Sequence, residues 1–342
     1  MKRLCALLPV LLLACAALVA GQLEVHFVDV GQGDAIVLRT SDAVVLVDAG
    51  QYDQLAAYLA RIGVDSVDLA VATHGHADHI GGFAAVFERF PVRRVWYNGQ
   101  THTTRTFERF IDAVLASRAA YHEPAAGERA TFSELVLTVL HPPHSAAQYD
   151  GHLHDMNIVL RADYGGFSVL LTGDAELHVE RELIAGGAEL RSTVLKLGHH
   201  GSRTSSTAEF LQAVSPEVAV YQAAADNPYG HPHPEVLLRV QRLTDAEVYG
   251  TDRHGTIVIA SDGDGYEVST VRTSVPVTAT CVDVNSASPE ELMRIVHIGP
   301  VRARRLIELR PFTSQADLRR IDGIGPARLN DIGEQGLVCP IE

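Results

Sequence analysis

The residues best able to do chemistry lie together between Thr73 and His79. This segment holds His74, His76, Asp78 and His79, so four potential metal ligands fall within six residues. Imidazole and carboxylate groups together suit Zn²⁺, and Mn²⁺ or iron can also use them. We expect two ions here, because a single ion rarely takes four ligands from so short a loop.

The elements that must present these ligands are visible in the hydrophobic pattern. From Glu24 the chain alternates strand-like and helix-like stretches. A strand over Val67–Thr73 leads into the ligand-rich segment, and a helix over Ile80–Arg89 follows it. We expect the N-terminus of that helix to point back at the ligands. Many strands with helices between them predict a mixed α/β fold with two layers of sheet.

The order of ligands in His74-x-His76-x-Asp78-His79 resembles the signature of the metallo-β-lactamase superfamily. This resemblance implies an αββα fold, in which two sheets lie between helices and metal-binding loops gather at one edge. It implies that His74 and His76 bind the first ion, and that Asp78 and His79 bind the second. It also implies that Asp174, directly after an apolar strand, bridges the ions; the alternative is a helix N-cap.

The resemblance does not decide which histidine is the last ligand of each ion. His199 or His200, after the strand Val194–Leu197, should complete the second ion, and we favour His199 because it is nearer the strand end. His154 is the expected third ligand of the first ion, with His152 as its rival. A supporting role for His154, outside the ligand set, is also open.

Further residues are expected to act beside the ions. The resemblance implies that Asp48, at the end of a strand, supports the metal loop through hydrogen bonds. His231, in the proline-rich segment Asn227–Pro234, is a candidate substrate contact or proton donor to the leaving group. We therefore name Asp78 and His231 as catalytic candidates. An ordinary loop before a helix that begins with proline explains the segment around His231 equally well.

Four longer phrases are similar to one branch of this superfamily, the β-lactamase-like domain of ComEC-type competence proteins. The similarity covers about residues 22–270 and implies a role in DNA uptake. That domain normally stands at the end of a polytopic DNA channel. Here only residues 4–20 form a long apolar run, so we expect a stand-alone relative. The phrases are Phe27–Ala35, Leu171–Asp174, His199–Ser202 and Tyr229–Pro232.

The C-terminal segment, which opens with Val282–Leu292, resembles the helix-hairpin-helix domain of ComEA-type competence proteins. Two hydrophobic-glycine turns each expose backbone N–H groups at the start of a helix, where they bind phosphate without reading bases. The first turn has His297 where glycine is more usual, so we expect weaker binding there. The following arginines contact flanking phosphates or form a solvated face. The expected DNA-binding residues are Ile298, Gly299, Gly323, Ile324 and Gly325, and the arginines are Arg302, Arg304, Arg305 and Arg328.

The first residues resemble an export leader. Lys2 and Arg3 precede an apolar run that is short for a membrane span. We expect residues 1–21 to direct export, with a lipid on Cys15, simple cleavage and an uncleaved anchor as alternatives. In each case the folded part lies outside the cytoplasm, whether secreted, periplasmic or lipid-anchored at the cell surface.

Outside the leader only Cys281 and Cys339 remain, and an isolated pair in an oxidising compartment favours a disulfide. The two cysteines bracket the C-terminal segment. We therefore divide the chain into a hydrolase domain over residues 22–270, a Val/Thr/Ser-rich linker over 271–280, and a DNA-binding domain over 281–342.

A net charge of −14 argues against a protein that coats nucleic acid by bulk electrostatics, so phosphate must be attracted locally. Two divalent ions, Zn²⁺ or alternatively Mn²⁺, would lower the pKa of bound water and neutralise developing charge. The two resemblances together predict a metal-dependent phosphodiesterase or deoxyribonuclease, with the tail holding DNA non-specifically and no nucleotide cofactor. The alternatives are a small phosphodiester or β-lactam substrate, or a DNA receptor with a structural metal site.

Overall fold

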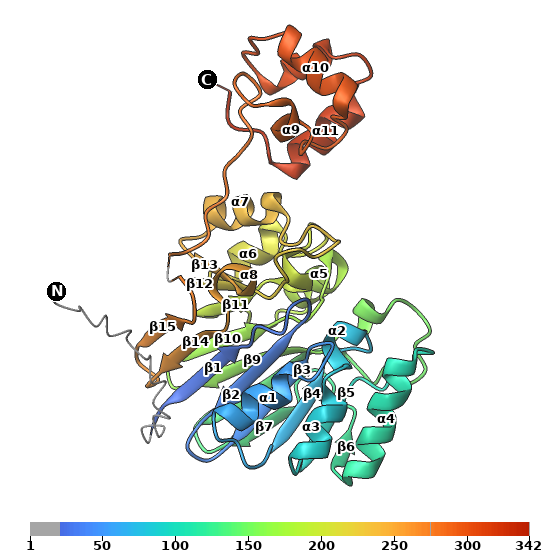
Figure 1. Cartoon of the computed structure of the whole chain (residues 1–342), viewed down its shortest axis with the longest axis vertical. Helices are drawn as coiled ribbons and strands as arrows, with labels where there is room; N and C mark the ends of the chain where they lie inside the picture. Colours follow the sequence, from blue (N-terminus) through green and yellow to red (C-terminus); the bar gives the residue numbers. More distant parts are fainter. Residues whose placement is uncertain (1–20, 274, 342) are drawn as a thin grey trace, which may run out of the picture.

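A computed structural model describes residues 21–273 and 275–341 (Figure 1). The expected export leader, including the candidate lipid site Cys15, therefore lies outside the described residues except for Gly21. Two β-sheets pack face to face, and helices cover both outer faces. The predicted αββα arrangement is confirmed.

The first sheet has the strand order β15-β14-β1-β2-β3-β4-β5-β6. Strands β3, β4, β5 and β6 run parallel to one another, and the remaining pairs are antiparallel. Its strands are β1 (Leu23–Phe27), β2 (Ala35–Arg39), β3 (Val44–Ala49), β4 (Leu69–Ala72), β5 (Arg94–Tyr97), β6 (Ala120–His122), β14 (Ile257–Ser261) and β15 (Tyr266–Thr270).

The second sheet has the order β13-β12-β11-β10-β9-β8-β7. Strands β10 to β13 are parallel, and β7, β8, β9 and β10 form an antiparallel meander. Its strands are β7 (Arg129–Phe132), β8 (Leu135–His141), β9 (Val159–Tyr164), β10 (Phe167–Leu171), β11 (Val194–Lys196), β12 (Val218–Tyr221) and β13 (Glu247–Gly250).

The hydrophobic core lies between the sheets and continues on their outer faces. In β8 the alternate residues Leu135, Leu137 and Val139 are buried between the sheets, because successive strand side chains point to opposite faces. Strands β4 and β10 are buried along their whole length, as strands covered on both faces must be. The helices that cover the first sheet are α1 (Gln54–Arg61), α3 (Phe83–Arg89) and α4 (Arg105–Ser117), and those that cover the second are α5 (Leu177–Ala185), α6 (Ala208–Val214) and α7 (Pro234–Leu243).

The prediction of one helix over Ile80–Arg89 is wrong in two respects: the helical segment starts earlier, and it is broken into two helices. A single helical turn, α2 (Ala77–Ile80), begins inside the ligand-rich segment, and α3 begins only at Phe83. The break falls at Gly81 and Gly82, which pack against the chain after β3. A Cβ atom at Gly81 would lie 2.3 Å from the Gln51 carbonyl oxygen, so a larger residue cannot fit there.

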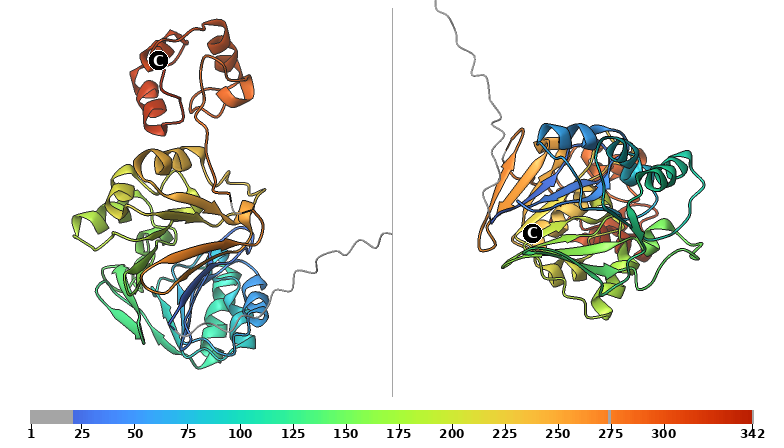
Figure 2. Two further views of the ribbon diagram at one scale, coloured as in Figure 1. Left: turned by 90° about the vertical axis from the view of Figure 1, so that its left-hand side faces the viewer. Right: turned by 90° about the horizontal axis from the view of Figure 1, so that it is seen from below.

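The C-terminal segment forms its own small helical core beyond α7, joined to the sandwich by residues after β15 (Figure 2). Cys281 and Cys339 are joined by a disulfide at its base. Leu238 of α7 packs into this core, and the Arg242 guanidinium donates a hydrogen bond to the Gly336 carbonyl at 2.8 Å. The tail helices are α9 (Pro289–Leu292), α10 (Pro300–Glu308), η3 (Gln315–Arg320) and α11 (Pro326–Gln335). Among the described helices of the whole chain, none combines the length and apolar character needed to cross a bilayer.

Candidate metal centre

The candidate ligands gather at one edge of the sandwich because they follow the ends of strands. The ligand-rich segment follows β4, Asp174 follows β10, and His199 and His200 follow β11 in the short helical turn η2 (Gly198–Gly201). Strands β3 and β4 are parallel in one sheet, and β10 to β12 are parallel in the other. Carboxyl ends of parallel strands meet at one edge, which is where α/β proteins place their sites.

A first cluster of ligand atoms forms around His74, His76, His154 and Asp174. His76 Nδ1 lies 2.9 Å from His74 Nε2 and 3.0 Å from His154 Nε2. Asp174 Oδ2 lies 3.7 Å from His74 Nε2 and 3.5 Å from His154 Nε2. His154, in the helical turn η1 (Leu153–Met156), thus joins the two histidines expected for the first ion.

A second cluster forms around His79, His200 and Asp78. The His200 Nε2 atom lies 3.2 Å from Asp78 Oδ2. Asp174 Oδ1 lies 3.2 Å from His79 Nε2 and 3.6 Å from His200 Nε2. Asp174 therefore turns one carboxylate oxygen towards each cluster, which is the arrangement that a bridging ligand requires.

Buried polar atoms without hydrogen-bond partners lie in the second cluster, and their chemistry fits a divalent ion. His79 Nε2, His200 Nε2 and Asp174 Oδ1 are buried and make no hydrogen bond of good geometry within residues 21–273 and 275–341. A buried polar atom without a partner costs about 1–3 kcal/mol, so such atoms rarely converge without a reason. Three nitrogen and carboxylate donors aimed at one point suit a divalent metal ion.

The imidazole rings are held so that their lone pairs face the clusters. Asp48 accepts hydrogen bonds from the Thr73 backbone N–H at 2.8 Å, the Thr73 hydroxyl at 2.7 Å and His79 Nδ1 at 2.7 Å. Because the Thr73 hydroxyl donates to Asp48, it can only accept from His74 Nδ1, which lies 3.0 Å away. Both rings then carry their proton on Nδ1 and leave Nε2 free to bind metal. The supporting contacts expected of Asp48 are present.

Asp34 supports His200, a role that the sequence analysis did not predict. Its carboxylate lies 3.1 Å from His200 Nδ1 and 2.7 Å from the ammonium group of Lys196, and all three side chains are buried. By distance alone Asp34 could join the second cluster. It faces the opposite ring nitrogen from Asp78, however, and already pairs with Lys196, so we assign it a positioning role. A charged residue inside the apolar strand β11 was the available signal.

Glu176 is a second missed residue and lies beside the first cluster. Its Oε1 atom lies 3.1 Å from His199 Nδ1 and 3.4 Å from His154 Nδ1, and it accepts a hydrogen bond from the Thr204 hydroxyl at 3.0 Å. One carboxylate thus orients two histidines. The short spacing from Asp174 was the only sequence signal for Glu176.

The preference for His199 over His200 at the second ion does not agree with the geometry. His200 is buried between Asp34 and Asp78, whereas His199 lies on the other side of Asp174, with Nε2 3.7 Å from Asp174 Oδ2. Both residues have left-handed backbone conformations, with φ of 49° and 56°. Two successive left-handed residues turn consecutive side chains to different clusters, which distance from the strand end could not predict.

The electrostatics of the centre reflect its excess of buried carboxylates. Burial opposes protonation of His200, but Asp174 and Asp34 outweigh this effect and raise its pKa to about 9. Burial likewise opposes protonation of His79, yet Asp174 and Asp48 raise its pKa well above the ordinary value. Burial and the neighbouring His79 hold the pKa of His74 well below its ordinary value. The carboxylates thus attract a cation, which a metal ion would supply.

His231 lies at the rim of the centre, beside the two histidines that follow β11. Its ring centroid is 5.4 Å from that of His199 and 6.0 Å from that of His200. Burial and the nearby His200 lower the pKa of His231 to about 3. The rival ligand His152 is exposed, and its Nδ1 atom accepts a hydrogen bond from the His154 backbone N–H at 3.4 Å. The structure therefore favours His154 as ligand.

The tail places its two hairpin turns in equivalent conformations. Gly299 and Gly325 cap the N-termini of α10 and α11, and a Cβ atom at either position would meet open space, so another molecule can approach both. Ile298 and Ile324 are buried in the tail core, so their side chains are not open to another molecule. At the position where the second hairpin has Gly323, with φ of 80°, the first has His297, with φ of 65°.

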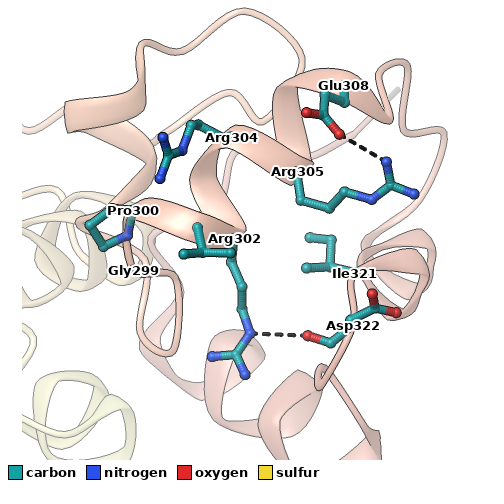
Figure 3. Close-up of a pocket in the computed structure, with 9 residues that line it drawn as sticks. Gly299, Pro300, Arg302, Arg304, Arg305, Glu308, Ile321 and Asp322 are labelled. Carbon is teal, nitrogen blue, oxygen red and sulfur yellow. Dashed lines mark hydrogen bonds and ion pairs between the residues drawn. The ribbon is translucent and has the colours of Figure 1, made fainter.

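Three of the four candidate DNA-binding arginines make contacts within the tail. Arg302 donates hydrogen bonds to the carbonyl oxygens of His297 and Asp322, and so ties the two hairpins together. Arg328 donates to the Gly323 carbonyl, and Arg305 pairs with Glu308. Figure 3 shows Arg302, Arg304 and Arg305 around a pocket between α10 and Asp322.

Comparison with known proteins identifies the catalytic part. The family model described as the metallo-beta-lactamase superfamily matches residues 28–224. The chain belongs to this superfamily. A helix-hairpin-helix motif model matches residues 277–335.

Curated relatives point to competence proteins. ComE operon protein 3 of Bacillus subtilis is 30% identical over 257 residues, which cover 68% of this chain and 32% of the relative. Competence protein ComA of Neisseria gonorrhoeae is 32% identical over 252 residues, which cover 71% and 33%. A protein named deoxyribonuclease from a Thioalkalivibrio species is 28% identical over 237 residues, which cover 67% and 63%. The chain spans about a third of the length of the two competence proteins.

These findings confirm the resemblance to the ComEC-type branch and to helix-hairpin-helix domains. The chain is a metallo-β-lactamase-fold protein of the metal-dependent hydrolase type, with competence proteins among its relatives. Its buried histidine and aspartate groups are able to hold divalent metal ions. The individual ligand assignments, and the division of the chain into domains, stay predictions.

Proposed function

We propose that this protein is an exported phosphodiesterase that cleaves DNA with two divalent metal ions, Zn²⁺ being the native metal we expect and Mn²⁺ the alternative. The observation that carries the proposal is the position of Asp174. Its two oxygens face two separate clusters at distances of 3.2–3.7 Å, so one carboxylate can serve two ions. Paired ions suit phosphodiester hydrolysis, because they lower the pKa of bound water and neutralise charge on the transferring phosphoryl group.

The residues of this chain would divide the work. His74, His76 and His154 would hold the first ion, and Asp78, His79 and His200 the second, with Asp174 shared. His231, at the rim, would contact the substrate. Asp48, the Gln222 carbonyl and Glu176 would keep the histidines in the required tautomers, and Asp34 would pair with His200.

The tail supports DNA as the substrate. Gly299 and Gly325 leave the N-termini of two helices open to approach, and such ends bind phosphate through backbone N–H groups. A duplex held by the tail raises the local concentration of scissile bonds at the metal centre. An acidic catalytic domain therefore need not bind DNA by itself, which reconciles the net charge of −14 with a polyanionic substrate.

Export is part of the proposal. The disulfide between Cys281 and Cys339 suits an oxidising compartment, where such bonds persist. The leader over residues 1–21 would deliver the chain there, either with a lipid on Cys15 or after simple cleavage. Fractionation of cells that produce the full chain, with labelling by a fatty acid, distinguishes these routes.

The first test is incubation of the purified full chain with plasmid and linear DNA, with chelator or with added Zn²⁺ or Mn²⁺. We expect metal-dependent cleavage that chelator abolishes. Asp78→Ala should abolish cleavage and keep DNA binding, because Asp78 lies in the second cluster and far along the chain from the tail. A metal-loaded protein that binds DNA and never cuts it would show a receptor instead.

Deletion of the residues after Thr280 separates the DNA hypothesis from hydrolysis of a small diester. We expect this deletion to remove most DNA cleavage and to leave turnover of a small chromogenic phosphodiester. Equal DNA cleavage with and without the tail would contradict its role in substrate delivery. Because Leu238 and Arg242 contact the tail, the deletion needs a folding control by circular dichroism.

A further inference from the structure

The loop between β12 and α7 is rigid and carries an exposed aromatic side chain at the rim of the metal centre. The Asn227 side chain accepts hydrogen bonds from the backbone N–H groups of Tyr229 at 3.2 Å and His231 at 3.0 Å. It also donates to the carbonyl oxygens of Ala224 at 2.8 Å and His231 at 2.6 Å. Asn227 thus uses its full hydrogen-bonding capacity to fix the loop.

This loop aligns three rings that lead away from the centre. Tyr229 stacks on His231, with ring centroids 5.7 Å apart and an interplanar angle of 26°. His231 in turn contacts His233, with centroids 5.0 Å apart, and lies 5.4 Å from His199. The outermost residue, Tyr229, is 62% exposed. A large exposed aromatic ring, held in place and next to a reaction centre, is a surface that is ready to stack against a flat ligand.

A cationic group lies on the same rim. The Arg203 backbone N–H donates to His233 Nδ1 at 3.1 Å, and the Arg203 side chain is 53% exposed. Its guanidinium pairs with the buried Glu235 at 3.3 Å and so stays near the three rings. Aromatic surfaces beside a positive charge are what proteins use to bind single-stranded nucleic acid, with bases on the rings and phosphates near the cation.

We propose that Tyr229, stacked on His231 and flanked by Arg203, binds an unpaired nucleobase next to the scissile phosphate. The subsite rests on the proposed phosphodiesterase function and deepens it, because it selects nucleotide over simple phosphodiesters and single-stranded DNA or frayed ends over paired duplex. A base inside a duplex has no free face to offer the ring, whereas an unpaired base does. Stacking does not distinguish between bases, so the subsite is not sequence-specific.

The test compares two small chromogenic substrates that are too short to use the tail. One is the para-nitrophenyl ester of thymidine monophosphate, which carries a base, and the other is methyl para-nitrophenyl phosphate, which does not. The quantity measured is the ratio of their kcat/KM values. We expect Tyr229→Ala to lower this ratio by about 5- to 150-fold, the range that loss of one base–aromatic stack implies. Tyr229→Phe keeps the ring and should keep the ratio.

Tyr121→Ala is the matched control, because Tyr121 is 44% exposed and lies in β6, the edge strand of the first sheet. It should leave the ratio unchanged. A ratio that Tyr229→Ala does not change would overturn the proposal. Equal losses on both substrates would also overturn it, since they would show damage to the metal centre without a role in base binding.

A second measurement tests this subsite if the wild-type chain hydrolyses neither small substrate, and it is independent of the DNA-cleavage assay that tests the proposed function. A short single-stranded oligonucleotide with a fluorescent purine loses emission when the purine stacks on an aromatic ring. We expect the full chain to quench this emission, with the titration midpoint shifted to higher protein concentration in Tyr229→Ala and not in Tyr229→Phe. Identical titrations for the wild type and Tyr229→Ala would overturn the subsite.

Discussion

The two ligand clusters share Asp174 but differ in how firmly the protein holds them. In the second cluster, His79 and His200 are buried and bonded at Nδ1 to acceptors at 2.7 Å and 3.0 Å, the first from Asp48 and the second from the Gln222 carbonyl. In the first cluster, His154 depends on a longer contact of 3.4 Å to Glu176, which is itself partly exposed. The supporting shell is therefore tighter around the second cluster.

This difference predicts that the second ion binds more tightly than the first. Residues that orient metal-binding histidines typically contribute 10–100-fold to metal affinity, through the ring orientation and the tautomer that they fix. A firmly held ion beside a more weakly held one would leave the weaker ion open to the substrate.

The largest effect is expected from Asp174→Ala, because it removes the one carboxylate that both clusters share. We expect loss of both metal equivalents, measured by elemental analysis, and a fall in cleavage of more than about 100-fold, beyond what loss of a supporting residue costs. Asp65→Ala, at an exposed carboxylate, is the control. Retention of one tightly bound equivalent in Asp174→Ala would show that the clusters are independent.

The next largest effect is expected from Asp48→Ala, which removes the acceptor of His79 Nδ1 and of both Thr73 donors. We expect the more tightly held ion to lose about 10–100-fold in affinity, measured by chelator competition. The chelated protein should also lose about 1–3 kcal/mol of stability in thermal unfolding, for each buried donor left without a partner.

Asp48→Asn sharpens this result. The variant keeps one oxygen acceptor but presents an N–H group that cannot accept the His79 proton. Its metal affinity should therefore fall while its stability falls less than in Asp48→Ala. Unchanged chelator competition in both variants would contradict the idea that Asp48 sets the tautomer of His79.

The fold and the first ligands could be predicted because their signals are local. His74, His76, Asp78 and His79 lie within one turn after an apolar strand, so a few residues of sequence contain most of the pattern. The alternation of strands and helices likewise predicts two sheets between helices, and the αββα arrangement is confirmed. Asp174 could be placed because it directly follows β10.

Asp48 could be predicted as a supporting residue, but Asp34 and Glu176 could not, because tertiary contacts create their roles. Asp34 meets His200 only when β2 and β11, which belong to different sheets, are brought together. The division of labour between His199 and His200 depends on two left-handed residues in succession, a conformation that neither residue type indicates. The break in the helix after Ile80 arises from close backbone approach at Gly81 and Gly82.

Glu176→Ala tests the first cluster, whose ion we expect to be held more weakly. It removes the acceptor shared by His154 Nδ1 and His199 Nδ1, so we expect the more weakly held ion to lose about tenfold in affinity, at the lower end of the range for supporting residues. Glu176→Gln keeps an oxygen acceptor and should retain most of the affinity. If Glu176→Ala weakened the tightly held ion instead, our assignment of the two sites would be reversed.

The smallest effect is expected from Thr204→Val, which removes a hydroxyl that donates to Glu176 at 3.0 Å. One such hydrogen bond contributes about 0.5–1.5 kcal/mol, so the affinity for the weaker ion should fall by about 2- to 12-fold. Thr204→Ser keeps the hydroxyl and should bind metal as the wild type does. In the double variant with Glu176→Ala, Thr204→Val should have no additional effect, because the hydroxyl acts only through that carboxylate. An additive loss in the double variant would mean that Thr204 acts directly on His199, whose Nδ1 lies 3.3 Å from the hydroxyl.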